Sequence, residues 1–376
     1  MLTYEKHLHL FHEGHDSETA KGTYKIEHNV NALMGCITRY PINYATLLSL
    51  ESEAVNAIAS LGLKKDASFN PNSNKDVASK LETLHLGVVI PRTAKGNISL
   101  TKDWFDQHQG VHTFIDTIGS WREHNRKLQS IEQIKKNLTG DQNHIHTTWR
   151  TFSDKGSGSI ISEAYPVANT PSDLRGIFVA PEDAKWIQVN LDYLHLEIMA
   201  HISRDLTLSD DLSQEDPLSA MASRLHLKPE VASAFIESII SDFDSIAISD
   251  FQTIFGSAYP QASKHILGKF PPSSVLALDF YERFRNFNLD PEIKSLTPGK
   301  IIETLFYQNA TYAIKNLICS LISFHPVLKT HLWIPLQTGL AFTCPLDEVD
   351  SVRDFFKLGV PLTKCSVLVG DTWPSK

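Results

Sequence analysis

The sequence predicts an α+β protein, and two stretches carry this prediction. In residues 178–205, apolar and polar residues alternate from Ile187 to Asn190, as in a strand whose two faces differ. From Leu194 the apolar residues become too dense for alternation, which is typical of a helix mostly enclosed by protein. A second, longer helical pattern covers residues 301–324 and changes from amphipathic to buried.

Size and composition describe an ordinary globular protein. The 376 residues suggest two or three domain-sized units, and the 42% hydrophobic and 21% charged residues allow a real core. The net charge of −8 gives no overall electrostatic support for nucleic-acid binding, although such binding depends on local patches. There is no apolar run long enough to span a bilayer and no signal-peptide pattern at Met1. We therefore expect a cytoplasmic protein without a membrane partner, and association with the nucleoid stays an open alternative.

Cysteine and histidine show no metal-binding spacing. We expect the four cysteines to be reduced structural thiols, and we expect the histidines near the N-terminus to lie on a solvated strand or loop. These residues are Cys36, Cys319, Cys344 and Cys365, and His7, His9, His12 and His15.

The strand–helix stretch resembles the motif A region of the palm in family A DNA polymerases, the bacterial DNA polymerase I class. Phe178-Val-Ala-Pro-Glu-Asp183 is similar to the approach to that motif, and Ile198-Met-Ala-His201 is similar to its exit. Between them the family carries D-Y-S-Q-I-E-L-R, whose first Asp holds the two catalytic magnesium ions.

An ungapped alignment from both flanks puts other residues at the chemical positions. The metal-binding Asp falls on Asn190, the steric-gate Glu on His195 and the Arg on Glu197. The pair Asp192-Tyr193 also looks like the family's D-Y, but reaching it needs a two-residue insertion and a matching deletion. We prefer the ungapped alignment and keep Asp192 as the alternative.

The resemblance covers roughly residues 24–376 and implies a right-hand fold. It would have a thumb, a palm with an antiparallel sheet flanked by helices, and reduced fingers, without a proofreading domain. The expected divisions are an N-terminal extension (1–23), the helix region leading into the palm (24–68), the thumb (69–145), the palm with motif A (146–205), the reduced fingers (206–300), and the palm again with its long helix, hairpin and last strand (301–376).

Two stretches resemble the family's thumb. Phe69-Asn-Pro-Asn-Ser73 is similar to F-N-x-N-S, and Ser73 is expected to cap a helix over residues 74–84. Trp121 to Leu128 corresponds to Y-R-x-L-x-K-L on the long thumb helix. The resemblance implies that basic side chains here track phosphates, and the open alternative is the solvated face of a helix. These side chains are Arg122, Arg126, Lys127, Lys135 and Lys136.

Several polar positions that the family aims at DNA have changed. His144 to Trp149 is similar to R-I-H-T-S-F, but Ser159 replaces the Arg of T-G-R-L-S-S. In Pro166-Val-Ala-Asn-Thr-Pro171 the Asn is kept as Asn169, and Ala168 replaces Gln. Gln308 stands where the family has the Gln of Q-G-T-A. The resemblance therefore implies that Asn169 and Gln308 are the nucleic-acid contacts retained outside the thumb.

The triphosphate-binding motif B is weak. The best candidate is residues 252–260, where Gln252 replaces the Lys and Pro260 replaces the Gly that follows the Tyr. No Arg stands on the preceding turn, at Ile248 and Ser249. Because a triphosphate is bound by Arg, Lys and metal, this segment offers little to hold one.

The hairpin motif is shortened as well. Residues 336–342 correspond to L-Q-V-H-D-E-L-V-F, but H-D-E has contracted to Thr338-Gly339, which we expect to form the tight turn. Two-metal phosphoryl transfer needs carboxylates around two divalent cations, and magnesium prefers anionic oxygen. Asn190 and Thr338 offer only a carbonyl and a hydroxyl.

The sequence thus predicts a catalytically degenerate polymerase with no cofactor, acting as a scaffold for nucleic acid or for a protein partner. The first alternative is an active DNA polymerase that binds Mg²⁺ through Asp192, with Glu197 or a distant carboxylate as second ligand. A third hypothesis is a remnant without a role. The partner, the biological process in replication or repair and the oligomeric state stay open.

Overall fold

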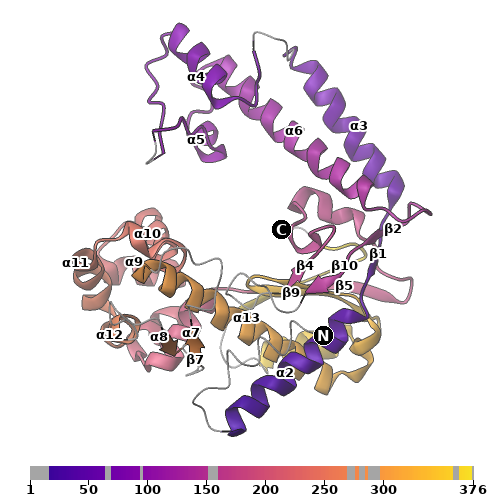
Figure 1. The fold of residues 1–376 in the computed structure, drawn as a ribbon, viewed down its shortest axis with the longest axis vertical. Helices are drawn as coiled ribbons and strands as arrows, with labels where there is room; N and C mark the ends of the chain where they lie inside the picture. Colours follow the sequence, from indigo (N-terminus) through magenta and orange to yellow (C-terminus); the bar gives the residue numbers. More distant parts are fainter. Residues whose placement is uncertain are drawn as a thin grey trace. The chain divides into compact units, whose positions relative to one another are not determined.

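The computed structural model describes residues 17–63, 69–93, 96–150, 160–268, 276–278, 284–286, 297–358 and 364–374 (Figure 1). They divide into two compact units. The helical unit contains Pro41–His146 and Asn169–Phe178, and the sheet unit contains the described parts of Met1–Tyr40, Thr147–Ala168 and Val179–Pro374. Two short strands, β1 (Arg39–Pro41) and β2 (His144–His146), lie where the chain passes between the units.

The helical unit is built on two long helices, α3 and α6, which pack along each other. Its small core includes Val77, Trp104 and Phe105. The predicted cap at Ser73 is confirmed, since its hydroxyl accepts the backbone N–H of Asp76 at 3.2 Å. The elements are α3 (Tyr44–Ser60), α4 (Asn74–Thr83), α5 (Lys102–Gln107), α6 (Thr113–Lys136) and the 3₁₀ turn η2 (Ser172–Ile177).

The sheet unit contains a four-stranded antiparallel sheet in the order β10-β5-β9-β8. The central strand β5 pairs with β9 on one side and with β10 on the other. The predicted strand, the buried helix that follows it and the predicted long helix over residues 301–324 are all confirmed, as β5, α7 and α13. The strands are β5 (Ala184–Leu191), β8 (Trp333–Leu336), β9 (Gly339–Pro345) and β10 (Cys365–Gly370), and the accompanying helices are α2 (Ser17–Gly35), α7 (Leu194–Ser203), α13 (Pro298–Phe324) and α14 (Val349–Leu358).

A group of short helices between α7 and α13 packs with these two helices into one hydrophobic cluster of the sheet unit. Buried Asp205 holds two of them by their N-termini: one oxygen accepts the N–H of Leu208, and the other accepts the N–H groups of Gln261 and Ala262. The elements are α8 (Leu206–Ser213), α9 (Pro217–Leu225), α10 (Pro229–Ser241), η3 (Phe243–Ser245), α11 (Ile248–Phe251), the π-turn η4 (Gln252–Gly256) and α12 (Pro260–Gly268).

Smaller elements complete the described chain. They are β3 (Trp149–Arg150) paired with β4 (Ile161–Ser162), η1 (Val167–Asn169), β6 (Leu276–Leu278) paired with β7 (Phe284–Asn286), and η6 (Pro326–Thr330). Within the described ranges, no helix combines the length and the apolar character needed to cross a membrane.

Candidate functional site

Asn190 lies at the end of β5, between Gly339 of β9 and Ser366 of β10. Its side chain belongs to a hydrogen-bonded row on the sheet. Trp373 Nε1 donates to Gln188 Oε1 at 2.7 Å, and Gln188 Nε2 donates to Asn190 Oδ1 at 2.8 Å. Asn190 Nδ2 in turn donates to Ser366 Oγ at 3.1 Å. Both ends of the Asn190 amide are therefore bonded within the protein.

The other three members of this row were not predicted from the sequence. Gln188 and Asn190 are two residues apart, so their side chains share a face of the strand, and this spacing was the available signal. Ser366 and Trp373 lie far along the chain, and only the pairing of β10 with β5 brings them to this face.

The hairpin between β8 and β9 closes tightly, but one residue earlier than predicted. Leu336 and Gly339 are the last paired residues, so Gln337 and Thr338 form the turn and the prediction of a Thr338-Gly339 turn is wrong. The two-residue loop leaves Gly339 inside the sheet, where a Cβ atom would stand 2.2 Å from the carbonyl oxygen of Val189. No side chain, and hence no carboxylate, fits at position 339 unless the backbone shifts.

Asp192 lies in the turn between β5 and α7. Its backbone N–H donates to the carbonyl oxygen of Lys364 at 2.9 Å, and the next residue, Tyr193, has a left-handed backbone with φ of 56°. On α7, burial raises the pKa of Glu197 to about 7, while the Lys364 charge opposes this rise. Among the described residues, no three His, Cys, Asp or Glu side chains come together in a way that could hold a metal ion. Asn190 itself offers magnesium only a neutral amide oxygen, which already accepts a hydrogen bond from Gln188.

His195, which the ungapped alignment puts at the steric-gate position, is buried on α7, with 8% of its surface exposed. Burial lowers the pKa of His195 to about 4, against a hydrogen bond to the Phe306 backbone that raises it. The ring packs edge-on against Phe306 and Tyr307. At neutral pH this side chain is therefore an uncharged packing group.

The candidate motif B covers the π-turn and the start of α12. Gln252 is exposed on this turn. Tyr259 is fully buried, and its hydroxyl donates to Asp211 Oδ2 at 2.8 Å. Burial and this hydrogen bond raise the pKa of Tyr259. Arg224 also donates two hydrogen bonds to Asp211. The Tyr259 ring and the Asp211 carboxylate therefore both help to pack α8 and α9 against the segment that leads into α12.

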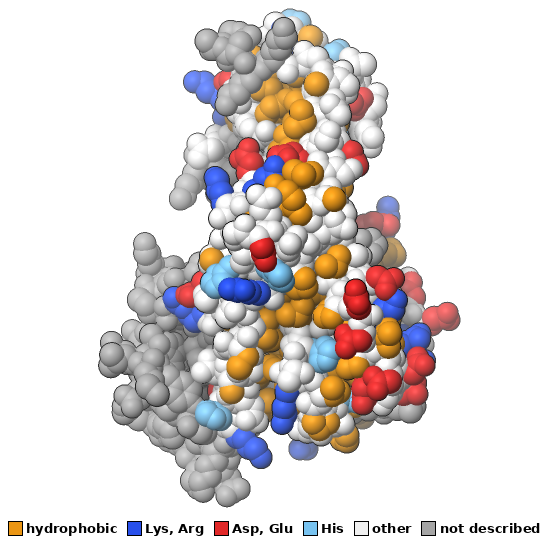
Figure 2. Space-filling view, turned by 90° about the vertical axis from the view of Figure 1, so that its right-hand side faces the viewer, with side chains coloured by type: hydrophobic (Ala, Val, Ile, Leu, Met, Phe, Trp, Pro, Cys, Tyr) orange, Lys and Arg blue, Asp and Glu red, His pale blue; other side chains and the backbone are white. Residues whose placement is uncertain are grey.

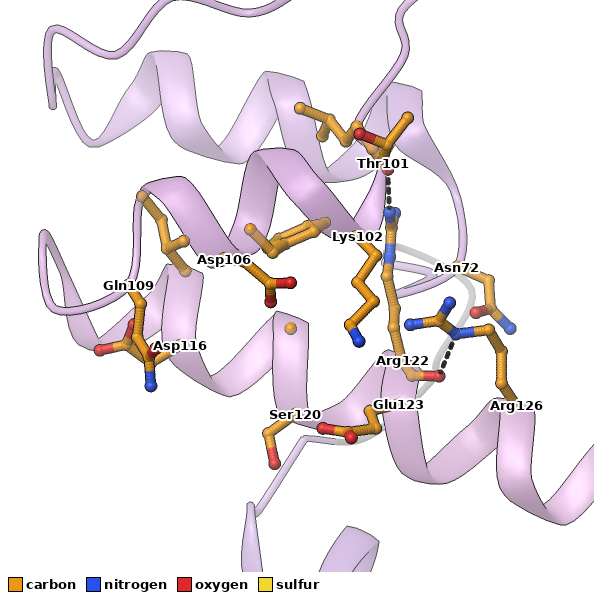
Figure 3. A pocket seen from close by; sticks show the side chains of 14 residues that line it. Asn72, Thr101, Lys102, Asp106, Gln109, Asp116, Ser120, Arg122, Glu123 and Arg126 are labelled. Atoms are coloured by element: carbon orange, nitrogen blue, oxygen red, sulfur yellow. Dashed lines mark hydrogen bonds between the residues drawn. The ribbon is translucent and has the colours of Figure 1, made fainter. Parts of the chain in front are cut away.

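Arg122 is an internal brace of the helical unit. Its Nε donates to the Pro71 carbonyl at 2.8 Å, and its Nη1 donates to Asn74 Oδ1 and to the Leu100 carbonyl. The guanidinium stands 5.1 Å from the centre of the Phe105 ring, beside a cavity of about 480 Å³ (Figure 3). Burial lowers the pKa of Arg122, and so does the nearby charge of Arg126. This geometry favours a structural role for Arg122 over a phosphate contact.

The other basic residues of α6 differ in how freely they could reach a phosphate. Lys127 pairs with Asp173 at 3.5 Å, and Lys135 pairs with Glu51. Arg126 and Lys136 are exposed, and neither forms an ion pair with another described residue. On the face that Figure 2 shows, Lys and Arg side chains are scattered among other types and form no continuous basic surface.

The two predicted contacts outside the thumb are placed differently. Asn169 is exposed at the end of η1. Gln308 is on α13 with only 5% of its surface exposed, so it is not displayed to a ligand on the protein surface. Ala168 is half-buried, and Ser159 lies outside the described residues.

Comparison with known proteins identifies the class of protein to which this chain belongs. The sequence model of DNA polymerase family A matches residues 46–236, just over half of the 376 residues. The chain therefore belongs to DNA polymerase family A.

A similar solved structure is the POL domain of Pol1 from M. smegmatis, in complex with DNA primer-template and dNTP. The match has a TM-score of 0.68 and 17% sequence identity, and it covers 94% of this chain and 69% of that one. The mixed α/β fold of a family A polymerase domain is thereby established for this chain. No protein of curated function matches the sequence.

Proposed function

We propose that this chain is a family A polymerase fold that has lost nucleotide transfer and serves as a non-catalytic scaffold for nucleic acid or for a protein partner. One observation carries the proposal. Asn190, at the end of β5, has its amide bonded to Gln188 and Ser366, opposite a glycine that leaves no room for a side chain. The proposal takes this strand end as the position of the family's metal-binding Asp. We propose that it works in the cytoplasm, at DNA replication or repair.

The proposed ligand is DNA, held weakly. The similar M. smegmatis domain is bound to primer-template DNA, and we extend only that ligand class to this chain. With Arg122 committed to internal acceptors, the proposed contact residues are Arg126 and Lys136 on α6, together with Asn169. Two exposed cations without an ion-pair partner among the described residues, on a chain of net charge −8, favour weak and salt-sensitive binding.

Replacing Arg126 and Lys136 together by alanine is expected to weaken DNA binding and to make it less sensitive to salt. Fluorescence anisotropy with labelled primer-template DNA, measured over a salt series, gives the slope of log K against log[salt]. We expect the slope to fall by about one unit for each phosphate that the variant no longer neutralises. The matched control is Lys127→Ala, which removes a cation already paired with Asp173 and should change the slope much less. Binding that is tight, resistant to salt and unaffected by the double replacement would refute these contacts.

Primer extension tests the loss of catalysis. We expect no nucleotide incorporation by the unmodified protein with magnesium or with manganese, because Asn190 and Thr338 supply no carboxylate for two metal ions. Asn190→Asp is expected not to restore incorporation, since the second ligand and the motif B cations are missing too and such sites fail as a unit.

The same assay separates the alternative of an active polymerase that uses Asp192. The position of Asp192 directly after β5 keeps this alternative worth testing. Incorporation that disappears in Asp192→Ala would establish it and would overturn the scaffold proposal.

A further inference from the structure

A second cavity, of about 350 Å³, lies within the sheet unit. Its walls come from α7, α9, α10, α13 and the hairpin turn, and they include Tyr193, His195, Glu237, Tyr307 and Gln337. The volume suits a small ligand or a single long side chain.

The charge of this cavity favours a cation. Glu237 is its carboxylate, and no Lys or Arg stands among the described residues that line it. His195 adds no positive charge at neutral pH, because burial keeps its pKa at about 4. The pKa of Tyr193 is raised by burial and then by the charges of Asp216 and Asp192, so two further carboxylates act on the rim, while Lys364 lies near enough to act on Asp216. A phosphorylated nucleotide would find no cation here to neutralise it.

The remaining lining matches the parts of an alkylammonium group. Tyr193, His195 and Tyr307 bring aromatic rings to the wall, and the centres of the His195 and Tyr307 rings are 5.6 Å apart. The rings of Tyr193 and Tyr307 can attract an ammonium group, and Gln337 offers a further oxygen acceptor for N–H donors. The apolar side chains of Ile236 and Ile240 can cover an alkyl stem.

We propose that this cavity binds an alkylammonium group, carried either by a small amine or by a lysine side chain of a partner. The proposal goes beyond the scaffold function, since it requires neither DNA nor the loss of catalysis.

Isothermal titration calorimetry on the full chain, at low salt and neutral pH, tests it with n-butylammonium and n-butyrate, which have similar stems and opposite charges. We expect n-butylammonium to bind at least about tenfold more tightly than n-butyrate. Glu237→Gln should weaken n-butylammonium by about fivefold or more, because it removes the carboxylate of the cavity. Glu237 is exposed on α10, so this variant should fold, and a thermal melt checks it.

Glu230→Gln is the matched control, because it makes the same change on α10 outside the cavity and should leave binding unchanged. Spermidine and Nα-acetyl-lysine methylamide then distinguish the two sources. Tighter binding of spermidine indicates a free amine, and tighter binding of Nα-acetyl-lysine methylamide indicates a lysine side chain of a partner. The proposal is overturned if n-butylammonium gives no heat, if n-butyrate or dATP binds as tightly, or if Glu237→Gln binds n-butylammonium like the unmodified protein.

Discussion

Gly339→Ala is expected to destabilise the sheet unit by about 3 kcal/mol or more, the upper range for forcing extra atoms into a packed interior. The new Cβ would stand 2.2 Å from the carbonyl oxygen of Val189 and 3.3 Å from the Cα of Asn190. Both atoms are backbone of β5, which is paired on both sides, so they cannot move without disturbing the register of β9 and β10. Urea unfolding followed by circular dichroism measures the loss.

Gly268→Ala is the matched control for this prediction. Gly268 ends α12 in the same unit, and a Cβ there would meet nothing within 4 Å. Alanine should therefore be neutral or slightly stabilising at this position. If Gly339→Ala and Gly268→Ala unfold at the same urea concentration, the close approach of β9 to β5 is not a constraint on the native protein.

The close approach of β9 to β5 also bears on the proposed loss of nucleotide transfer. A Gly339→Asp substitution meant to restore a carboxylate on the hairpin would meet the same backbone oxygen before its charge could act. Recovery of a second metal ligand therefore needs a longer hairpin, and the two-residue turn of Gln337 and Thr338 does not provide one.

Patterns local in the chain predicted the scaffold well. Alternation up to Asn190 followed by dense apolar residues predicted β5 and α7, and the cap at Ser73 predicted the start of α4. Each of these features depends on residues close in sequence, so periodicity and capping chemistry were sufficient. The turn was misplaced by one residue because Thr-Gly is a good local turn, while pairing with β5 places Gly339 in the strand.

The surroundings of individual side chains were harder to predict, because they depend on distant partners. Arg122 has the type and place of a phosphate ligand, yet the acceptors it bonds come from Pro71, Asn74 and Leu100. Gln308 follows a family motif, but the packing of α13 buries it. Nothing in the local sequence distinguishes an arginine that braces a fold from one that contacts DNA.

The second large effect is expected at a buried ion pair between α13 and α2. Lys315 Nζ contacts both carboxylate oxygens of Glu27, at 3.0 and 2.8 Å. The Lys315 side chain is 1% exposed and that of Glu27 is 12% exposed. Lys315→Met keeps a similar volume but leaves the Glu27 carboxylate without this ammonium group, so a loss of about 3 kcal/mol in the free energy of unfolding is expected.

A double-mutant cycle separates the value of the pair from the cost of breaking it. Glu27→Leu combined with Lys315→Met should recover most of the loss, because two apolar side chains replace a pair whose attraction was offset by desolvation. Lys300→Met is the matched control on the same helix, since the ion pair of Lys300 with Glu303 is more exposed and should contribute less than about 1 kcal/mol. A Lys315→Met loss no larger than that of Lys300→Met would mean that water screens the Glu27 charge and that this ion pair does little to hold α2 on α13.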